Sequence, residues 1–135
     1  MSNTLKLEII TPDAVVYSDE VDMVTLPGVE GQMGILPHHV RLMTQLIPGE
    51  IIVRKEGHAE SLAVGEGLVE VTGRSVSIVT AMAIAADKID EAAVQEAYER
   101  AASRLQEKLS LEEVASVNAA LTRSLAQLRV KRRRH

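Results

Sequence analysis

The chain has 135 residues, of which 46% are hydrophobic and none is cysteine, and its formal net charge is −4 at pH 7. This length fits one ordinary domain, or a small domain with an appendage, and the hydrophobic content excludes a disordered chain. The lack of cysteine excludes disulfides, thiolate metal sites and cysteine nucleophiles, and no apolar run approaches the roughly 20 residues of a membrane-spanning helix.

The segment from residue 1 to residue 86 is predicted to form short β-strands separated by turns. Leu5, Leu7 and Ile9 alternate with polar residues, which is the period of a half-buried strand. Further strands are predicted at residues 15–17, 21–26, 40–46, 50–55, 60–64, 68–72 and 75–81. All eight glycines and all four prolines lie at or before Gly73 and separate these runs. This spacing predicts a small sandwich or flattened barrel.

The 62 residues after Gly73 contain no glycine or proline, so residues 87–135 are predicted to form a separate hairpin of two helices. Asp87 is expected to cap the first helix, with Asp90 in its opening turn, where a carboxylate favours the helix dipole. Ser110-Leu111-Glu112-Glu113 is a capping box and predicts the start of the second helix.

The second helix carries a stripe that is predicted to pack against the first helix. Its members are Leu111, Val114, Asn118, Leu121, Leu125 and Leu128. Asn118 either fixes the register and eases opening of the hairpin, or is a partly exposed position of the stripe. Two short helices joined by alanines and leucines bury little area, so we expect docked and extended arrangements of the hairpin to be close in energy.

Charge is unevenly distributed along the chain. Lys/Arg and Asp/Glu number 5 and 11 in residues 1–86, 4 and 8 in residues 87–113, and 6 and 0 in residues 114–135. The six cations of the last segment therefore have no compensating acid near them in sequence. We expect this end, rather than the body, to be attracted to an acidic partner.

The basic tail from Arg129 to Arg134 has three interpretations. It could be a solvated helix end that complements the helix dipole, a contact for nucleic-acid phosphates, or a surface that docks against an acidic protein segment. The acidic body and the lack of stacking aromatic residues argue against nucleic acid. We favour docking against an acidic protein.

No group of residues predicts catalysis. His38 and His39 are adjacent, so in an extended segment they point in opposite directions and seldom bind one metal. Gly28, Gly31 and Gly34 lack the context of a phosphate loop and are interpreted as a turn. The carboxylates are scattered over predicted turns and helix starts. We therefore expect no enzyme activity, no metal and no cofactor.

The segment Glu30-Gly31-Gln32-Met33-Gly34-Ile35-Leu36-Pro37-His38-His39 resembles a signature of the epsilon subunit of rotary F-type ATP synthases. Residues 64–71, 76–79 and 89–92 also match that family in order, so the resemblance covers essentially the whole chain. It implies an α+β fold, with an antiparallel β-sandwich of about ten short strands followed by a C-terminal two-helix hairpin.

The resemblance also implies a non-catalytic subunit in the central stalk of a proton-translocating ATP synthase. Such a subunit would link the gamma subunit to the c-ring on the cytoplasmic face of the bacterial plasma membrane, and would meet the membrane only through the complex. The loop facing the ring would carry Glu30, Gln32, His38 and His39.

The resemblance further implies that the hairpin inhibits ATP hydrolysis when it extends and its basic residues meet an acidic stretch of the beta subunit, with the alpha subunit as a further candidate neighbour. The residues at the matching positions of this chain are Arg123, Arg129, Lys131, Arg132, Arg133 and Arg134.

One departure concerns nucleotide binding. Members that sense ATP carry the pattern I/L-D-x-x-R-A, whereas this chain matches at Ile89 and Asp90 but has Ala93 in place of the arginine. Because alanine cannot hold a phosphate or pair with Asp90, we do not expect ATP to bind here. A ligand sensor whose hairpin is held docked by a nucleotide is the alternative hypothesis, which calorimetry with ATP would test.

Overall fold

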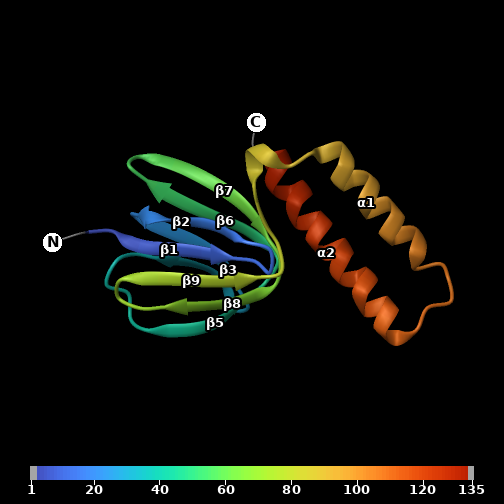
Figure 1. Cartoon of the computed structure of the whole chain (residues 1–135), viewed down its shortest axis with the longest axis horizontal. Helices are drawn as coiled ribbons and strands as arrows, with labels where there is room; N and C mark the ends of the chain where they lie inside the picture. The colour runs from blue at the N-terminus through green and yellow to red at the C-terminus, as the bar shows by residue number, and fades with distance from the viewer. Residues whose placement is uncertain (1–2, 134–135) are drawn as a thin grey trace.

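The computed structural model describes residues 3–133 and divides them into a strand-rich half followed by a helical half (Figure 1). The strands are β1 Leu5–Ile10, β2 Val15–Val21, β3 Met23–Gly28, β4 Gly31–Ile35, β5 Leu42–Leu46, β6 Gly49–Lys55, β7 His58–Val64, β8 Gly67–Val71, β9 Ser75–Thr80 and β10 Ala83–Ala85. The helices are a 3₁₀ turn at Ala86–Lys88, α1 at Glu91–Arg104 and α2 at Leu111–Arg133. The predicted β-sandwich followed by a two-helix hairpin is therefore confirmed.

The strands form one sheet that curls into two layers, in the order β10-β7-β6-β3-β5-β8-β9-β1-β2, with β4 added to β3. Neighbouring strands are antiparallel except β1 and β9, which are parallel, with Leu7 opposite Val76. Strand β2, at one end of this order, lies near β6 in the other layer, and there Lys55 forms an ion pair with Asp19. A side-chain contact, rather than a ladder of backbone hydrogen bonds, joins this part of the sandwich.

The core of the sandwich is aliphatic. Leu5, Leu7 and Ile9 are at most 1% exposed, which confirms the face predicted from their alternation. They pack with buried valines, leucines and isoleucines from the facing strands, among them Val24, Ile51, Leu62, Val69 and Ile78. Branched aliphatic side chains fit this pleated interior. The sandwich therefore has a continuous core although the chain contains no Phe or Trp.

The glycine-rich segment is a strand rather than the turn expected from its sequence. Val29 and Glu30 form a two-residue turn, which Gly31 completes with a positive φ of 122°, and the chain then pairs back on β3 as β4. Only Met33 and Ile35 of β4 turn inward. With only two hydrophobic side chains among its five residues, β4 shows no alternation long enough to predict a strand from the sequence. The short strand β10 was also not predicted.

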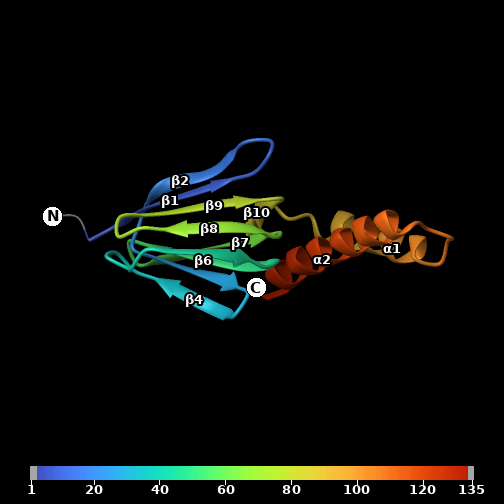
Figure 2. The same cartoon turned by 90° about the horizontal axis from the view of Figure 1, so that it is seen from below.

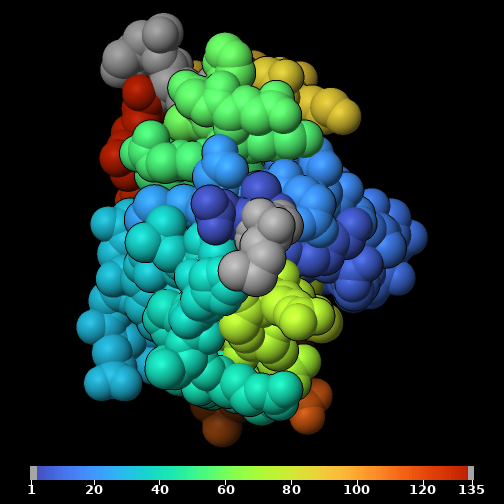
Figure 3. All heavy atoms as spheres, turned by 90° about the vertical axis from the view of Figure 1, so that its left-hand side faces the viewer, coloured from blue at the N-terminus to red at the C-terminus, as the bar shows by residue number. Residues whose placement is uncertain are grey.

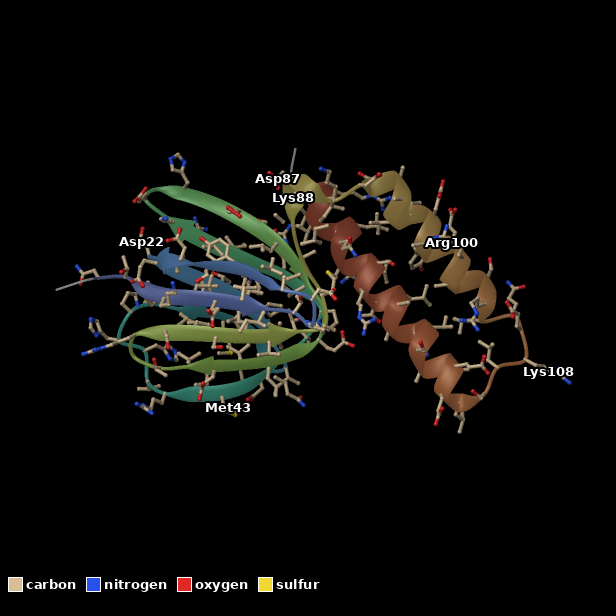
Figure 4. The ribbon with its side chains drawn as sticks, in the orientation of Figure 1. Asp22, Met43, Asp87, Lys88, Arg100 and Lys108 are labelled. Carbon is tan, nitrogen blue, oxygen red and sulfur yellow. The ribbon has the colours of Figure 1, made fainter. Side chains whose placement is uncertain are left out.

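The hairpin leaves the sandwich beside Asp87 and Lys88, and its joining turn near Lys108 lies at the far tip (Figure 4). The expected cap at Asp87 is wrong, because residues 86–88 form the 3₁₀ turn and α1 begins three residues later. Asp90 caps α1, and its Oδ1 accepts a hydrogen bond from the Ala93 N–H at 3.1 Å. The predicted capping box is confirmed: Ser110 and Glu113 exchange hydrogen bonds of 3.0 and 3.2 Å.

Helix α2 lies between the sandwich and α1 (Figure 1), and the hairpin projects from one end of the sandwich (Figure 2). Helix α2 contacts the sandwich mainly at β6 and β7. The opposite end of the sandwich, where β1 starts, is formed by turns, and the strands hide most of the helices behind it (Figure 3). The two ends of the sandwich therefore present different surfaces.

Candidate functional site

The contact between α2 and the sandwich is the first candidate functional surface. We call α1, α2 and the turn that joins them the arm. Val130 of α2 is 1% exposed and packs with Ala63 of β7, Ala86 and Ile89. Burial of a valine contributes about 1.5–3 kcal/mol, so this small cluster gives the docked arm an apolar anchor.

An ion pair in the middle of α2 forms the second contact. Arg123 donates from Nε and Nη2 to the two carboxylate oxygens of Glu66, both at 3.1 Å. Glu66 lies in the turn between β7 and β8, 57 residues earlier in the chain. The two-pronged hydrogen bond from Arg123 holds the pKa of Glu66 below its usual value, against the opposing effect of partial burial.

The last turn of α2 forms the third contact. Arg133 Nη1 lies 2.8 Å from Oε1 of Glu50 on β6, whose side chain is only 11% exposed. No donor of the described residues is aligned for a hydrogen bond with that buried oxygen, so the pair is electrostatic rather than a directed bond. Lys131 donates to the carbonyl oxygen of Ala86 at 3.3 Å.

Arg132 connects the last turn of α2 to α1. Its Nε donates to Glu91 at 2.9 Å and its Nη2 donates to Gln95 at 3.0 Å. These contacts, with those of Arg123 and Arg133, show that cations without an acid near them in sequence are compensated in the fold. The acids come from β6, a sandwich turn and α1, which are remote in sequence but adjacent in the fold.

Arg129 differs from these neighbours. It is exposed, and among residues 3–133 it has no ion pair or hydrogen-bond partner through its side chain. It lines a cavity of about 240 Å³ between α2 and the sandwich, together with Gln32, Glu50 and Arg133. Of the six cations predicted to meet the beta subunit, Arg123, Lys131, Arg132 and Arg133 are thus engaged within the chain, Arg129 is available, and Arg134 lies outside the described residues.

The residues predicted to face the c-ring do not form one loop. Glu30 and Gln32 lie near the end of α2, whereas His38 and His39 lie beyond the other end of β4. Residues 33–37 separate the two pairs, and at about 3.3 Å per residue the part of β4 from Gln32 to Ile35 alone spans roughly 10 Å. The His38 N–H donates to the carbonyl of Gly73 at 2.8 Å, which ties this second bend to the β8–β9 turn.

The predicted stripe on α2 is only partly buried. Leu111 is 89% exposed, so the stripe is wrong at this position, whereas the exposure of Asn118 agrees with its interpretation as an exposed position of the stripe. Val114, Leu121 and Leu125 are half-buried, and Leu128 is buried. The buried residues of α2 are Val117, Ser124, Ala126, Leu128 and Val130. They fall on two faces because α2 packs against both α1 and the sandwich. The four-residue spacing of Ala126 and Val130 was the available signal for the second face.

Two sandwich residues of this surface, Glu50 and Glu66, were not singled out from the sequence. Both are ordinary carboxylates next to glycines, and no local pattern pairs them with arginines more than 50 residues away. At the start of α1, Asp90 acts as a helix cap, and Ala93 contributes a backbone N–H to it. These contacts add nothing in favour of a nucleotide site.

Two features are absent from the part of the chain that the structure describes. Between residues 3 and 133 there is no group of three or more His, Cys, Asp or Glu side chains placed to hold a metal ion. Within the same range, no helix has the length and apolar character needed to cross a membrane.

Comparison with known proteins gives matches over both halves. The family model for the ATP synthase, Delta/Epsilon chain, beta-sandwich domain matches residues 4–86, and that for the ATP synthase, Delta/Epsilon chain, long alpha-helix domain matches residues 87–132. The ATP synthase epsilon chain of Herpetosiphon aurantiacus is 40% identical over 126 residues, covering 93% of each chain. That of Dehalococcoides mccartyi is 40% identical over 134 residues, covering 97% of this chain and 96% of the relative.

Solved structures share the fold. A chain of the Euglena gracilis mitochondrial ATP synthase (OSCP/F1/c-ring) superimposes with a TM-score of 0.74 at 24% identity, covering 90% of this chain and 78% of that chain. A chain of the Tetrahymena thermophila mitochondrial ATP synthase (central stalk/c-ring) gives a TM-score of 0.64 at 13% identity, covering 94% and 96%. At these identities the likeness shows the arrangement of sandwich and arm.

Proposed function

This chain belongs to the family of ATP synthase epsilon chains, and from that premise we propose that it is a regulatory central-stalk subunit of a proton-translocating ATP synthase. In this proposal the sandwich joins the gamma subunit to the c-ring, and the extended arm inhibits ATP hydrolysis. The chain has no active site of its own and is peripheral, on the cytoplasmic face of a bacterial plasma membrane. The observation that carries the proposal is an arm held to the sandwich by few and mostly exposed contacts.

An apolar row on the outer face of the sandwich is our candidate for the gamma contact. Leu68, Val79 and Val15 are 54–56% exposed, and Ile10 lies between the last two. The register places these side chains next to one another across β8, β9, β1 and β2. Exposed apolar groups that gather in this way are typical of a surface that another subunit covers.

The free edge formed by β4 is our candidate for the ring contact. Because β4 pairs only with β3, its outer edge is open from Glu30 and Gln32 to His38 and His39. A surface that lies along this edge can reach all four residues, although a single loop cannot. We therefore propose that the polar loops of the c-ring contact the open edge of β4 along its whole length.

The weak docking of the arm supports its role as a mobile brake. No residue of α1 is buried, and the docked arm depends on α2 for its contacts with β6 and β7. Exposed ion pairs contribute only about 0–1 kcal/mol each, so docked and extended states can differ by a small free energy. Once extended, α2 would present its cations to an acidic segment of the beta subunit, with the alpha subunit as a further candidate neighbour.

The proposal is tested by deleting residues 88–135 and measuring ATP hydrolysis by the assembled enzyme at low ATP. We expect hydrolysis to rise, because the inhibitory segment is gone. Unchanged hydrolysis would contradict the brake while leaving the structural role intact. That role is tested separately: Val79→Glu should reduce co-purification with the gamma subunit, whereas Glu70→Gln on the neighbouring strand should not.

A further inference from the structure

We propose that Glu66 and Glu50 form an electrostatic latch, built into the chain, that holds the arm docked without a bound ligand. The latch occupies Arg123 and Arg133, two of the guanidinium groups that an extended arm would need for an acidic partner. Its regulatory consequence rests on the function proposed above. The latch itself is a property of the isolated chain.

The backbone around Glu66 is held by hydrogen bonds made within the sandwich. The Thr80 hydroxyl, in a side chain only 2% exposed, lies within hydrogen-bond distance of the carbonyl oxygens of Gly65 and Glu66, at 2.9 and 3.0 Å. The Ala81 N–H also donates to the Glu66 carbonyl at 3.0 Å. A carboxylate on so well-held a turn loses little backbone freedom when it binds, which favours its pairing with the arm.

The path of this turn depends on one glycine inside the sandwich. A Cβ added to Gly65 would lie 3.6 Å from Cγ of Arg123, in contact with that side chain, and a Cβ added to Gly67 would collide with the carbonyl oxygen of Val79. Only a glycine at position 67 therefore lets the turn follow this path. It places the Glu66 carboxylate where Arg123 meets both oxygens.

The cations of the arm are divided between two tasks. Arg123 and Arg133 are held by Glu66 and Glu50, whereas Arg129 is exposed and has no partner in the described chain. Neutralising Glu66 frees a cation and weakens docking. Neutralising Arg129 removes a cation without touching the docked contacts. The latch therefore predicts opposite effects of these two changes on inhibition.

The latch biases the arm rather than locking it. The side chains of Arg123 and Glu66 are 37% and 49% exposed, and ion pairs with such exposure shift an equilibrium only a few-fold. We expect Glu66→Gln to raise the ratio of extended to docked arms about two- to fivefold. Glu66→Arg should raise the ratio further, because it places like charges together.

The test uses the full-length chain with spin labels on cysteines introduced at Met43 and Lys108, which lie on the sandwich and at the tip of the arm (Figure 4). The chain has no other cysteine. Electron–electron distance measurements should show more extended arms for Glu66→Gln and no change for the matched control Glu70→Gln. The double variant Glu66→Arg with Arg123→Glu should bring the ratio back toward the wild-type value. Equal distances for Glu66→Gln and Glu70→Gln, or no recovery in the double variant, would overturn the latch.

Hydrolysis by the assembled enzyme separates the latch from the brake. Glu66→Gln should deepen inhibition and Arg129→Gln should relieve it, with the arm distance of Arg129→Gln unchanged. If Glu66→Gln extends the arm without changing hydrolysis, the latch stands and the brake is wrong. If Arg129→Gln itself extends the arm, the assignment of separate tasks to the two arginines is wrong.

Discussion

The sandwich and the arm are stabilised in different ways. The sandwich buries a continuous aliphatic cluster from β1 to β9, whereas α1 has no buried residue and α2 has five. Backbone ladders connect the strands, while the arm meets the sandwich through one side of one helix. Stability is therefore concentrated in the first half, and local opening is expected in the second. The difference indicates that one chain combines a rigid anchor with a segment whose position can be regulated.

The largest effect is expected in the sandwich core. Ile78→Ala removes a side chain that is fully buried and should lower the free energy of unfolding by about 2–5 kcal/mol. Val79→Ala, at the adjacent half-exposed position, should change it by less than about 0.5 kcal/mol. Urea unfolding of the two variants measures the contrast. Similar losses at both positions would mean that the core is not where this fold is stabilised.

The next effect is expected where the arm is anchored. Val130→Ala should destabilise the docked arm by about 1–3 kcal/mol, because it removes two methyl groups from the cluster with Ala63 and Ile89. Hydrogen exchange of α1 and α2 should accelerate while exchange in β1 and β9 stays the same. If the sandwich amides accelerate equally, arm and sandwich unfold together and the comparison fails.

A smaller effect is expected at the start of α2. Ser110→Ala removes the hydroxyl oxygen that accepts a hydrogen bond from the Glu113 N–H. We expect it to destabilise α2 by about 0.5–2 kcal/mol and to leave the sandwich unchanged. Ser116→Ala, at an exposed position in the second turn of α2, is the matched control and should be neutral or slightly stabilising. The measurement is hydrogen exchange of the first turn of α2. Equal exchange in both variants would show that the box does not determine this helix start.

The smallest effect concerns pH. Because Arg123 lowers the pKa of Glu66 below its usual 4.5 in the docked state, the pair favours docking at pH above that value and loses its contribution as pH falls through the lowered pKa. The docked fraction of the wild-type chain should therefore fall more on acidification than that of Glu66→Gln. Label distances at pH 7 and pH 3 check this. If the docked fraction falls equally in the two chains, the response to acid comes from other carboxylates.

Local patterns predicted local structure well. The alternation at Leu5, Leu7 and Ile9 placed β1, and the spacing of Ser110 and Glu113 placed the start of α2, because in each case the deciding contacts lie within a few residues. The misplaced cap had a similar cause, since Asp87 and Asp90 are both suitable residues and only the 3₁₀ turn distinguishes them. Fold class followed from such signals together with the family signature.

Contacts between remote segments could not be predicted in the same way. The pairing of Arg123 with Glu66 depends on where the β7–β8 turn comes to lie against α2, and no spacing in the chain encodes that. Strand β4 was missed because its pairing partner β3, rather than its own composition, makes it extended. The sequence therefore predicted the cations of the arm that belong to the candidate site. Their partners on the sandwich, Glu66 and Glu50, could be identified only from the structure.

The most direct measurement holds the arm closed by a covalent bond. Cysteines at Glu66 and Arg123, joined by a short reducible linker, would fix the docked arm in a chain that has no native cysteine. In the assembled enzyme, the single variant Glu66→Cys controls for the linker and the reductant, and the single variant Arg123→Cys controls for the loss of the Arg123 cation. We predict rapid ATP hydrolysis while the linker is intact and inhibition after reduction, when the arm is free to extend. The same rate before and after reduction would contradict a brake that works by leaving the sandwich.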